Sequence, residues 1–185
     1  MNTYFLYARK STDVEDKQVL SIESQINELR EFAKKENLEI VDEFTEAKSA
    51  KAPGRPIFSF MLKQIEASIA DGILAWHPDR LARNSIDGGK IIYLVDIGKI
   101  VDLRFPIYRF DNTAQGKFML SITFGQSKYY VDNLAENVKR GMREKLRRGE
   151  WPAWAPLGYL HEYKNHTVIV EPEKVHFVRK MFELY

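Results

Sequence analysis

Two short stretches of the sequence gather arginines around a hydroxyl or a carboxylate. YARKST, residues 7–12, and DRLAR, residues 79–83, each come soon after an apolar run. Arginine suits phosphate because its planar guanidinium donates two parallel hydrogen bonds and stays charged. Several arginines around Ser11 would stabilise the charge of a pentavalent phosphoryl transition state without a metal ion. A third candidate arginine, Arg55, follows a polar stretch that contains Ser49.

Each of these residues also has an ordinary structural interpretation. A lone arginine after a strand is usually a surface residue, and a lone serine there usually begins a loop or caps a helix. Asp79 and Arg80 could form a simple ion pair. Arg80 and Arg83 are three residues apart, so they point the same way only if a helical turn begins near them.

Other catalytic arrangements find less support in the sequence. A Ser–His–acid hydrolase needs flanking glycines and a basic histidine, but Ser11 has no flanking glycines and three of the four histidines lie in the C-terminal tail. The fourth, His77, precedes Pro78 and has no obvious partner. We expect no metal site, because there is no HExxH motif and no pair of histidines at ligand spacing. The absence of a GxxxxGK[ST] loop argues against nucleotide hydrolysis.

The composition is that of an ordinary soluble globular protein, with 185 residues, 44% hydrophobic and 29% charged. We expect no membrane partner, because no apolar run approaches the roughly 20 residues of a span. The chain has no cysteine and no visible signal peptide, which favours a cytoplasmic location. The net charge is only +2, but residues 139–148 hold six basic residues against one glutamate. This run is either a nucleic-acid contact or the solvated face of a helix.

Strands and helices alternate through the first half of the chain. Strands are expected at Thr3–Ala8, Leu38–Phe44, Gly72–Trp76 and Ile100–Leu103, and helices from Ser21 as N-cap, at Ile57–Ile69 and at Ser85–Ile97. This alternation predicts an α/β domain with a mainly parallel sheet. Residues at the carboxyl ends of parallel strands then share one sheet edge, where such folds bind their ligands.

A long helix is predicted from about Ala114 to Gly149, roughly 50 Å in length. Leu134, Val138, Met142 and Leu146 recur along it every four residues, so we expect a partner helix or a course out of its own domain. A bent helix, or two helices with a break near Gly125, is the alternative. A strand at Thr167–Val170 and an apolar helical pattern come next, and because the chain stops inside that pattern we expect it to be a piece of a longer protein.

These motifs resemble those of serine site-specific recombinases, which include resolvases, invertases and large serine integrases. YARKST, SIESQINELREFA, GRPIFSFML, ILAWHPDRLARN and GKFMLSITFG occur in this order in the family, so the resemblance covers about residues 3–149. RRGEWPAWAPLGYL followed by VEPEKVHFVRKMFELY is similar to the start of the DNA-binding domain of the large members. The resemblance implies a three-layer catalytic domain at 1–113, an oligomerisation helix at 114–149 and the beginning of a DNA-binding domain at 150–185.

The resemblance also implies roles for single residues. Ser11 matches the nucleophile, which attacks a DNA phosphodiester to give a 5′-phosphoserine link and a free 3′-hydroxyl. The arginines that bind the scissile phosphate are matched by Arg9, Arg80 and Arg83, and a further active-site arginine on a mobile loop is matched by Arg55. Asp79 matches an acid proposed to assist proton transfer or to orient arginines. Supporting positions are matched by Tyr7, Gln25 and Ser49, and less closely by Gln18.

Family members act as dimers on double-stranded DNA crossover sites and join into a tetramer that cuts, rotates and religates the strands. The phosphoserine link conserves the phosphodiester energy, so we expect no cofactor. The long helix would mediate association, and its basic end would contact DNA phosphates through Lys139, Arg140, Arg143, Lys145, Arg147 and Arg148. Many relatives carry Glu-Arg midway along this helix where this chain has Tyr130-Val131, so no role is assigned to those two positions.

The sequence therefore predicts a DNA recombinase of the integrase type, acting on a mobile element. Two rival functions remain open. One is a non-catalytic DNA-binding protein of the same fold, against which the joint presence of the arginines, Ser11 and Asp79 argues. The other is a phosphoesterase that uses the same serine, although such an enzyme has no use for a long basic helix.

Overall fold

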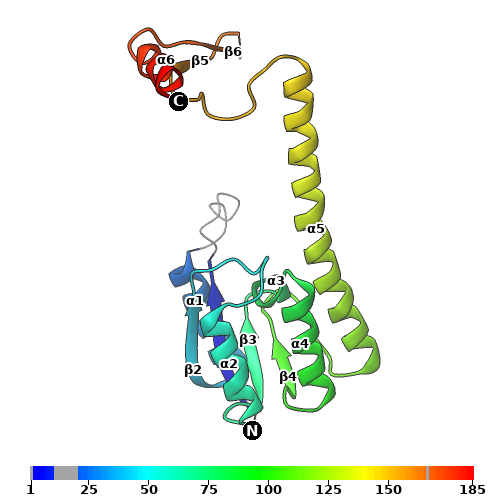
Figure 1. The fold of residues 1–185 in the computed structure, drawn as a ribbon. Helices are drawn as coiled ribbons and strands as arrows, with labels where there is room; N and C mark the ends of the chain where they lie inside the picture. The colour runs from blue at the N-terminus through cyan, green and yellow to red at the C-terminus, as the bar shows by residue number, and fades with distance from the viewer. Residues whose placement is uncertain (1, 11–20, 166) are drawn as a thin grey trace. The chain divides into compact units, whose positions relative to one another are not determined.

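A parallel β-sheet forms the centre of the first part of the chain (Figure 1). The computed structural model describes residues 2–10, 21–165 and 167–185. Within these residues four parallel strands pair in the order β2-β1-β3-β4. Their bounds are Thr3–Arg9 for β1, Glu39–Glu46 for β2, Gly72–Ala75 for β3 and Asp102–Arg104 for β4. The predicted parallel sheet is therefore confirmed.

Strand β4 begins two residues later than the sequence pattern predicted. The amide of Ile100 donates to the carbonyl of Leu94, and the amide of Val101 donates to the carbonyl of Asp71. Ile100 is thus still bonded to the preceding helix, although it is fully buried and looks like a strand residue. The apolar residues before β4 therefore resembled the start of the strand in the sequence.

Helices cover both faces of the sheet and complete three layers, as predicted. On one face α1 (Ile22–Glu36) packs Leu29 and Ala33 against Leu6 of β1 and Leu74 of β3. The other face carries α2 (Pro56–Glu66), α4 (Ser85–Asp96) and the start of the long helix, whose core residues include Phe58, Met61, Ile91, Leu94, Leu120 and Phe124. Successive residues of β1 alternate between the two cores because side chains alternate along a strand.

The helix starts are explained by local sequence. Ser21 is the N-cap of α1, as expected, and its side chain accepts from the amide of Ser24 at 3.1 Å. The α2 helix is shorter than predicted, since it ends at Glu66 and Ser68 has a φ of 59°. That left-handed conformation stops a helix whose apolar pattern continues to Ile69.

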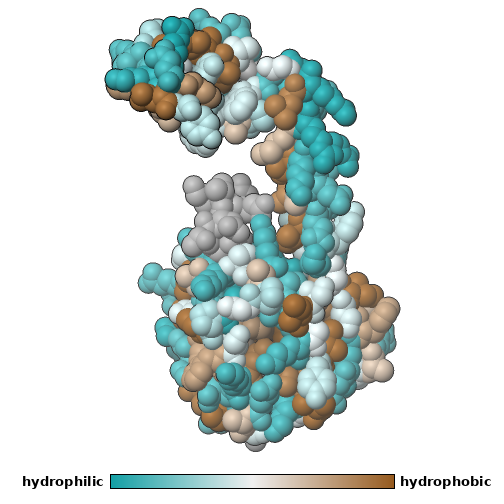
Figure 2. All heavy atoms as spheres, viewed as in Figure 1, coloured by the Kyte–Doolittle hydropathy of each residue, from teal (hydrophilic) through white to brown (hydrophobic). Residues whose placement is uncertain are grey.

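The long helix α5 is continuous from Ala114 to Arg147, without the break considered near Gly125. The helix ends at Arg147, and Gly149, whose φ of 76° suits glycine, follows it in the turn that comes next. The chain divides into two compact units, residues 1–131 and 132–185, and their boundary falls within this helix. Apolar side chains at Val138, Met142 and Leu146 are about half exposed, and Figure 2 shows apolar surface along part of the helix. The domain limits expected from the sequence stay a prediction.

The second unit contains a β-hairpin and a short helix. Strand β5 (Tyr159–Glu162) pairs antiparallel with β6 (Thr167–Val170), and α6 covers Val175–Leu184. Strand β6 is confirmed, whereas β5 was not recognised in the sequence. Gly158, with a φ of 86°, precedes β5, and a Cβ there would lie 2.9 Å from a methyl carbon of Val178. No helix of the described residues is long and apolar enough to cross a membrane.

Close approach of β3 to its neighbours leads to a first prediction. A Cβ on Gly72 would lie 2.6 Å from the carbonyl oxygen of Asp102 and 2.7 Å from the Tyr4 ring. We expect Gly72→Ala to lower the free energy of unfolding by about 1–3 kcal/mol, because overpacking pushes β3 away from β4. The measurement is urea-induced unfolding followed by circular dichroism.

Gly89→Ala is the matched control for that substitution. Gly89 lies in α4, where an added Cβ meets nothing within 4 Å. We expect this change to raise the free energy of unfolding by about 0.5–1 kcal/mol, since alanine favours a helix more than glycine does. Equal stability of the two variants would contradict the packing argument.

Candidate active site

The carboxyl ends of β1 and β3 bring the predicted arginines to one sheet edge. The two strands are parallel neighbours, with Tyr7 opposite Ala75. Strand β1 ends at Arg9, and β3 is followed by the one-turn helix α3 (Pro78–Leu81). Arg9 is fully buried, and its Nε donates to the carbonyl oxygen of Arg80 at 3.3 Å. The structure thus joins the two stretches that the sequence separates by about 70 residues.

Asp79 binds two of the arginines at once. Its Oδ1 accepts from Arg80 Nε at 3.1 Å, and its Oδ2 accepts from Arg80 Nη2 at 2.9 Å and Arg83 Nη2 at 3.0 Å. His77 Nδ1 lies 3.0 Å from the same carboxylate. The helical turn of α3 lets both arginines face Asp79, so the ion pair considered from the sequence is a cluster of three charged side chains.

The pKa of Asp79 lies well below its ordinary value. Burial by itself raises this pKa, but hydrogen bonds from His77 and Arg80 and the charges of Arg80 and Arg83 outweigh burial and lower it. The carboxylate is therefore ionised at neutral pH and is a weak base. Such a group orients arginines well and exchanges protons poorly.

Arg80 has one guanidinium nitrogen to spare. Its side chain is 3% exposed, and Nη1 is buried with no hydrogen-bond acceptor among the described residues. A buried N–H without an acceptor is unfavourable, so this atom is suited to an incoming anionic oxygen.

The segment 47–55 lies against the connection between α3 and α4. The carbonyl oxygen of Ala50 accepts from Asn84 Nδ2 at 3.0 Å and from the amide of Arg83 at 3.2 Å. Ser49 is half-buried, and its Oγ accepts from the amide of Lys51 at 3.3 Å, which makes a local turn. The predicted loop is thus tied directly to the second arginine stretch.

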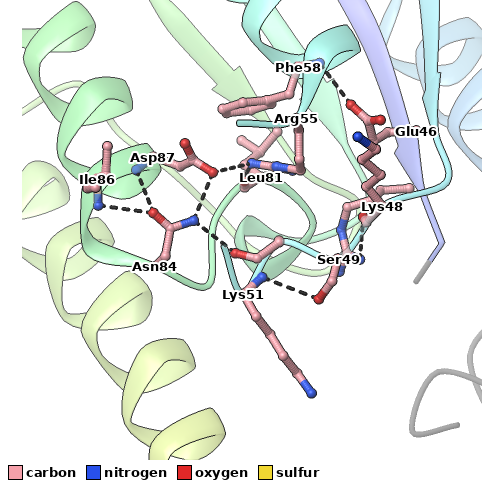
Figure 3. Close-up of polar contacts among 12 residues, drawn as sticks. Glu46, Lys48, Ser49, Lys51, Arg55, Phe58, Leu81, Asn84, Ile86 and Asp87 are labelled. Carbon is pink, nitrogen blue, oxygen red and sulfur yellow. Dashed lines mark hydrogen bonds and ion pairs between the residues drawn. The ribbon is translucent and has the colours of Figure 1, made fainter. Parts of the chain in front are cut away.

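Arg55 is a buried residue, although the sequence placed it on a mobile loop. It is the N-cap residue of α2 and is 1% exposed. Figure 3 shows its guanidinium directed at Asp87, whose Oδ2 accepts from Nη2 at 2.9 Å. Nη2 also donates to the carbonyl of Leu81, and Nη1 donates to Tyr7 Oη at 2.9 Å and to the carbonyl of Arg80 at 3.4 Å. The structure therefore places Arg55 behind the backbone of the arginine cluster.

Two supporting residues lie where they hold the arginines from behind. Gln25 is fully buried on α1, and its Nε2 donates to the carbonyl of Arg9 at 3.2 Å. Tyr7 is also fully buried, and burial raises the pKa of its phenol above the ordinary value, so the hydroxyl stays protonated. Ser11 and Gln18 lie outside the described residues.

Sequence analysis missed three buried polar residues of the site, which are Glu46, Asn84 and Asp87. Asn84 is the N-cap of α4, where its Oδ1 accepts from the amides of Ile86 and Asp87, and its Nδ2 donates to Asp87 Oδ2 at 2.8 Å. Glu46 accepts from the first amides of α2, those of Ile57 and Phe58, both at 3.1 Å. An asparagine followed three residues later by an acidic residue is a signal for the start of a helix, and this signal could have identified Asn84 and Asp87.

The six predicted DNA-contacting residues lie in the second unit, five of them on the last turns of α5 and Arg148 directly after its last residue. All are exposed: Lys139, Arg140, Arg143, Lys145, Arg147 and Arg148. Glu144, the one acid among them, pairs with Arg148 at 3.3 Å and with Arg147 at 3.8 Å. The run therefore keeps a strong excess of positive charge. At the departure from the family pattern, Tyr130 is exposed and Val131 is half-buried.

Comparison with known proteins gives a family match over most of the chain. The model of the family "Resolvase, N terminal domain" matches residues 4–151. The N-terminal catalytic domain of TP901-1 integrase is 25% identical, covers 71% of this chain and 98% of that chain, and has a TM-score of 0.52. A resolvase family site-specific recombinase from Streptococcus pneumoniae is 21% identical over 80% of this chain and 99% of that chain, with a TM-score of 0.45. A search of curated proteins found no match.

The low pKa of Asp79 predicts how its contribution to stability varies with pH. The unfolded chain has an aspartate pKa of about 3.9, and the folded value is lower. The ionised carboxylate therefore stabilises the fold above about pH 4, and this stabilisation is lost as the pH falls toward the folded pKa. We expect Asp79→Asn to lower the free energy of unfolding by about 2–3 kcal/mol at pH 7.

The measurement is urea-induced unfolding of wild type and Asp79→Asn between pH 7 and pH 3. Their difference should be constant from about pH 5 upward and shrink below about pH 4. Asp96→Asn is the control, because Asp96 forms an exposed pair with Lys117, worth at most about 1 kcal/mol. A difference for Asp79→Asn that grows on acidification would contradict the assignment.

Proposed function

The chain belongs to the resolvase family of serine recombinases, and from that membership we propose that it cuts and rejoins DNA through a covalent 5′-phosphoserine intermediate. Site-specific recombination is the general function that the family match supports. The substrate is a double-stranded DNA crossover site, and Ser11 is the nucleophile. The observation that carries the proposal is the cluster of Arg9, Arg80, Asp79 and Arg83 at the edge where YARKST leaves the sheet.

The chemistry is an exchange of one phosphodiester for another. Ser11 Oγ bonds to the scissile phosphorus and loses its proton, while the bond from phosphorus to the 3′-oxygen breaks and that oxygen takes up a proton. The 5′-phosphate stays on the serine, and attack by a 3′-hydroxyl reverses the step. Because one phosphate ester replaces another, rejoining needs no external energy source.

Arginine supplies the stabilisation of charge in this proposal. Asp79 is shared by Arg80 and Arg83, so these three side chains carry a net positive charge. The buried Nη1 of Arg80 lacks an acceptor among the described residues, and a phosphate oxygen would supply one. Fixed donors of this kind act most strongly in a water-poor site, where they need no reorganisation as the phosphorane charge develops.

Asp79 orients the arginines in this proposal and does not carry the proton. Its lowered pKa makes it a poor acceptor for the serine proton, and at neutral pH it has no proton to give the leaving 3′-oxygen. Its hydrogen bonds with Arg80 and Arg83 fix the directions of both guanidiniums. Of the two roles implied by the family resemblance, the geometry favours orientation.

Assembly of the recombining complex is assigned to α5. Half-exposed Val138, Met142 and Leu146 recur every four residues, which is the spacing of a face that packs on a second helix. We assign to this face the contact between copies in a dimer and a synaptic tetramer. The basic residues from Lys139 to Arg148 would bind DNA phosphates, so affinity should fall as the salt concentration rises.

Ser11→Ala gives the first test of the chemistry. The protein is incubated with a duplex enriched by binding from a random-sequence library, and the mixture is quenched in sodium dodecyl sulfate. Wild type should leave a protein–DNA adduct whose DNA has a free 3′-hydroxyl that a polymerase extends. Ser11→Ala should leave none, with DNA affinity and melting temperature unchanged, because the substitution removes a single hydroxyl.

Each other outcome supports a different function. Hydrolysed DNA without an adduct from wild type would favour the phosphoesterase. A folded wild-type protein that binds the duplex but gives neither adduct nor cleavage would favour the non-catalytic DNA-binding protein. An adduct that persists in Ser11→Ala would assign the nucleophile to another residue.

Arg80→Ala tests the stabilisation of charge. We expect the single-turnover rate constant for adduct formation to fall by about 10²–10³-fold, because a transition-state donor is lost. DNA affinity, measured by fluorescence anisotropy, should fall by less than about fivefold, since many phosphates contribute to binding. Arg30→Ala is the control, because Arg30 forms an exposed pair with Glu43 on α1 and β2. Equal losses of rate and affinity in Arg80→Ala would count against the assigned role.

A further inference from the structure

Arg55 uses most of its hydrogen-bonding capacity inside the protein. Of its five N–H groups, the four on Nη1 and Nη2 are directed at Tyr7 Oη, Asp87 Oδ2 and the carbonyls of Arg80 and Leu81. Asp87 also neutralises its charge. A guanidinium bonded in this way has nothing left to offer a phosphate on Nη1 or Nη2. Its Nε is buried and has no acceptor among the described residues, so the hydrogen bonds that Arg55 makes here are those of Nη1 and Nη2.

One face of the Arg55 guanidinium is closed as well. The ring of Phe58 lies over it, with 3.8 Å between the guanidinium carbon and the ring centroid. The side chain is 1% exposed, so DNA cannot reach it in this conformation. A cation in contact with an aromatic face and an aspartate is stably placed where it is.

Arg55 holds the backbone at Arg80 and Leu81. The carbonyl of Arg80 accepts from both Arg55 Nη1 and Arg9 Nε, and the carbonyl of Leu81 accepts from Arg55 Nη2. These two peptide units carry the Arg80 side chain and lead directly to Arg83. Any shift of Arg55 therefore shifts the main chain from which the phosphate-binding arginines project.

Asp87 determines where Arg55 lies. Its Oδ2 accepts from Arg55 Nη2 at 2.9 Å and from Asn84 Nδ2 at 2.8 Å, and the residue is 8% exposed. Asn84 in turn donates from Nδ2 to the carbonyl of Ala50 in the segment 47–55. The carboxylate thus joins the start of α4, the segment 47–55 and the end of α3 at one point.

We propose that Asp87 is a positioning residue for DNA cleavage, which fixes Arg55 and, through Arg55, the backbone that aims Arg80 at the scissile phosphate. Asp87 does not touch DNA. Arg55, which the family resemblance matched to a further active-site arginine on a mobile loop, becomes a clamp on the Arg80 and Leu81 carbonyls. The proposal rests on the proposed function, because it takes Arg80 to bind the phosphate.

Stability by itself gives a weak reason for such a pair. A buried ion pair contributes little net stability relative to well-packed apolar residues, because both ions lose their hydration. Directional hydrogen bonds, in contrast, fix atoms in place, and a displacement of about 1 Å in a catalytic group can lower a rate by about 10²-fold. Asp87 and Arg55 provide such directional bonds next to the cluster.

The test compares Asp87→Asn with a matched substitution at the other end of the sheet. Asn is nearly the same shape but removes the charge that holds Arg55. The control is Asp102→Asn, because Asp102 also pairs with an arginine, Arg104 Nε at 2.6 Å, and accepts from Tyr4 Oη at 2.8 Å. Asp102 starts β4, at the sheet edge opposite Arg9.

Single-turnover adduct formation on the enriched duplex, at saturating DNA, separates positioning from stability. Asp87→Asn should lower the rate constant by about tenfold or more, with the final amount of adduct and the DNA affinity within about twofold of wild type. A merely structural role would instead lower the melting temperature and the amplitude, and leave the rate constant unchanged. That second pattern, or an equal fall in rate constant for Asp102→Asn, would overturn the proposal.

Tyr7→Phe provides a second variant if Asp87→Asn fails to fold. It removes only the hydroxyl that accepts from Arg55 Nη1 and leaves the Asp87 charge in place. We expect a smaller fall in the rate constant, about threefold, with the amplitude retained. An unchanged rate constant would count against the clamp.

Hydrogen exchange distinguishes failure of this proposal from failure of the proposed function. The amide of Arg83, bonded to the carbonyl of Ala50, should exchange faster in Asp87→Asn than in wild type or Asp102→Asn, with or without DNA. If the Arg83 amide exchanges faster in Asp87→Asn but wild type forms no adduct, the positioning role of Asp87 and Arg55 stands and the phosphoserine chemistry is rejected. A wild-type adduct with unchanged exchange in Asp87→Asn would reject the clamp alone.

Discussion

The carbonyl oxygen of Arg80 receives hydrogen bonds from two other arginines, and the geometry of the candidate active site depends on this sharing. It arises because α3 is a single turn, so its last carbonyls have no amide partners within the helix. Ala82 is extended, with φ −148° and ψ 139°, and ends the turn abruptly. Side chains must then satisfy these carbonyls. Arg9 and Arg55 do so, and three cationic residues converge on one short stretch of backbone.

The parallel sheet supplies the other half of this arrangement. Strand β3 has only four residues, all buried, and it lies directly beside β1. The segments that leave the carboxyl ends of both strands therefore meet at the same edge, as general rules for parallel sheets require. Gly72 permits the close approach to β4 at the opposite edge, next to the carbonyl of Asp102. The domain thus separates a closely packed edge from an edge rich in charge.

The sequence predicted the sheet and the meeting of the two arginine stretches because both depend on local pattern and on parallel topology. It did not predict that Arg55 is buried. That position depends on Asp87 and Asn84, which lie about 30 residues further along the chain and read locally as the start of a helix. Glu46 was missed for the same reason, since its partners are the amides of another element. Polar residues that are paired across elements leave little trace in periodicity or composition.

The two ion-pair arrangements at this edge differ in a way that separates structural arginines from arginines suited to a substrate. Arg55 and Asp87 form a closed pair, one cation to one carboxylate, with side chains 1% and 11% exposed. Asp79 is shared by Arg80 and Arg83, is 21% exposed, and leaves an excess positive charge. A closed, buried pair gains nothing from an incoming phosphate, because its charge is already balanced. Among the described residues, Arg55 Nε and Arg80 Nη1 are both buried without an acceptor, so the two arrangements differ in charge and not in spare donors. The excess positive charge of the open cluster attracts an anion, which supports the proposal that Arg80 and Arg83 bind the phosphate and that Arg55 positions them.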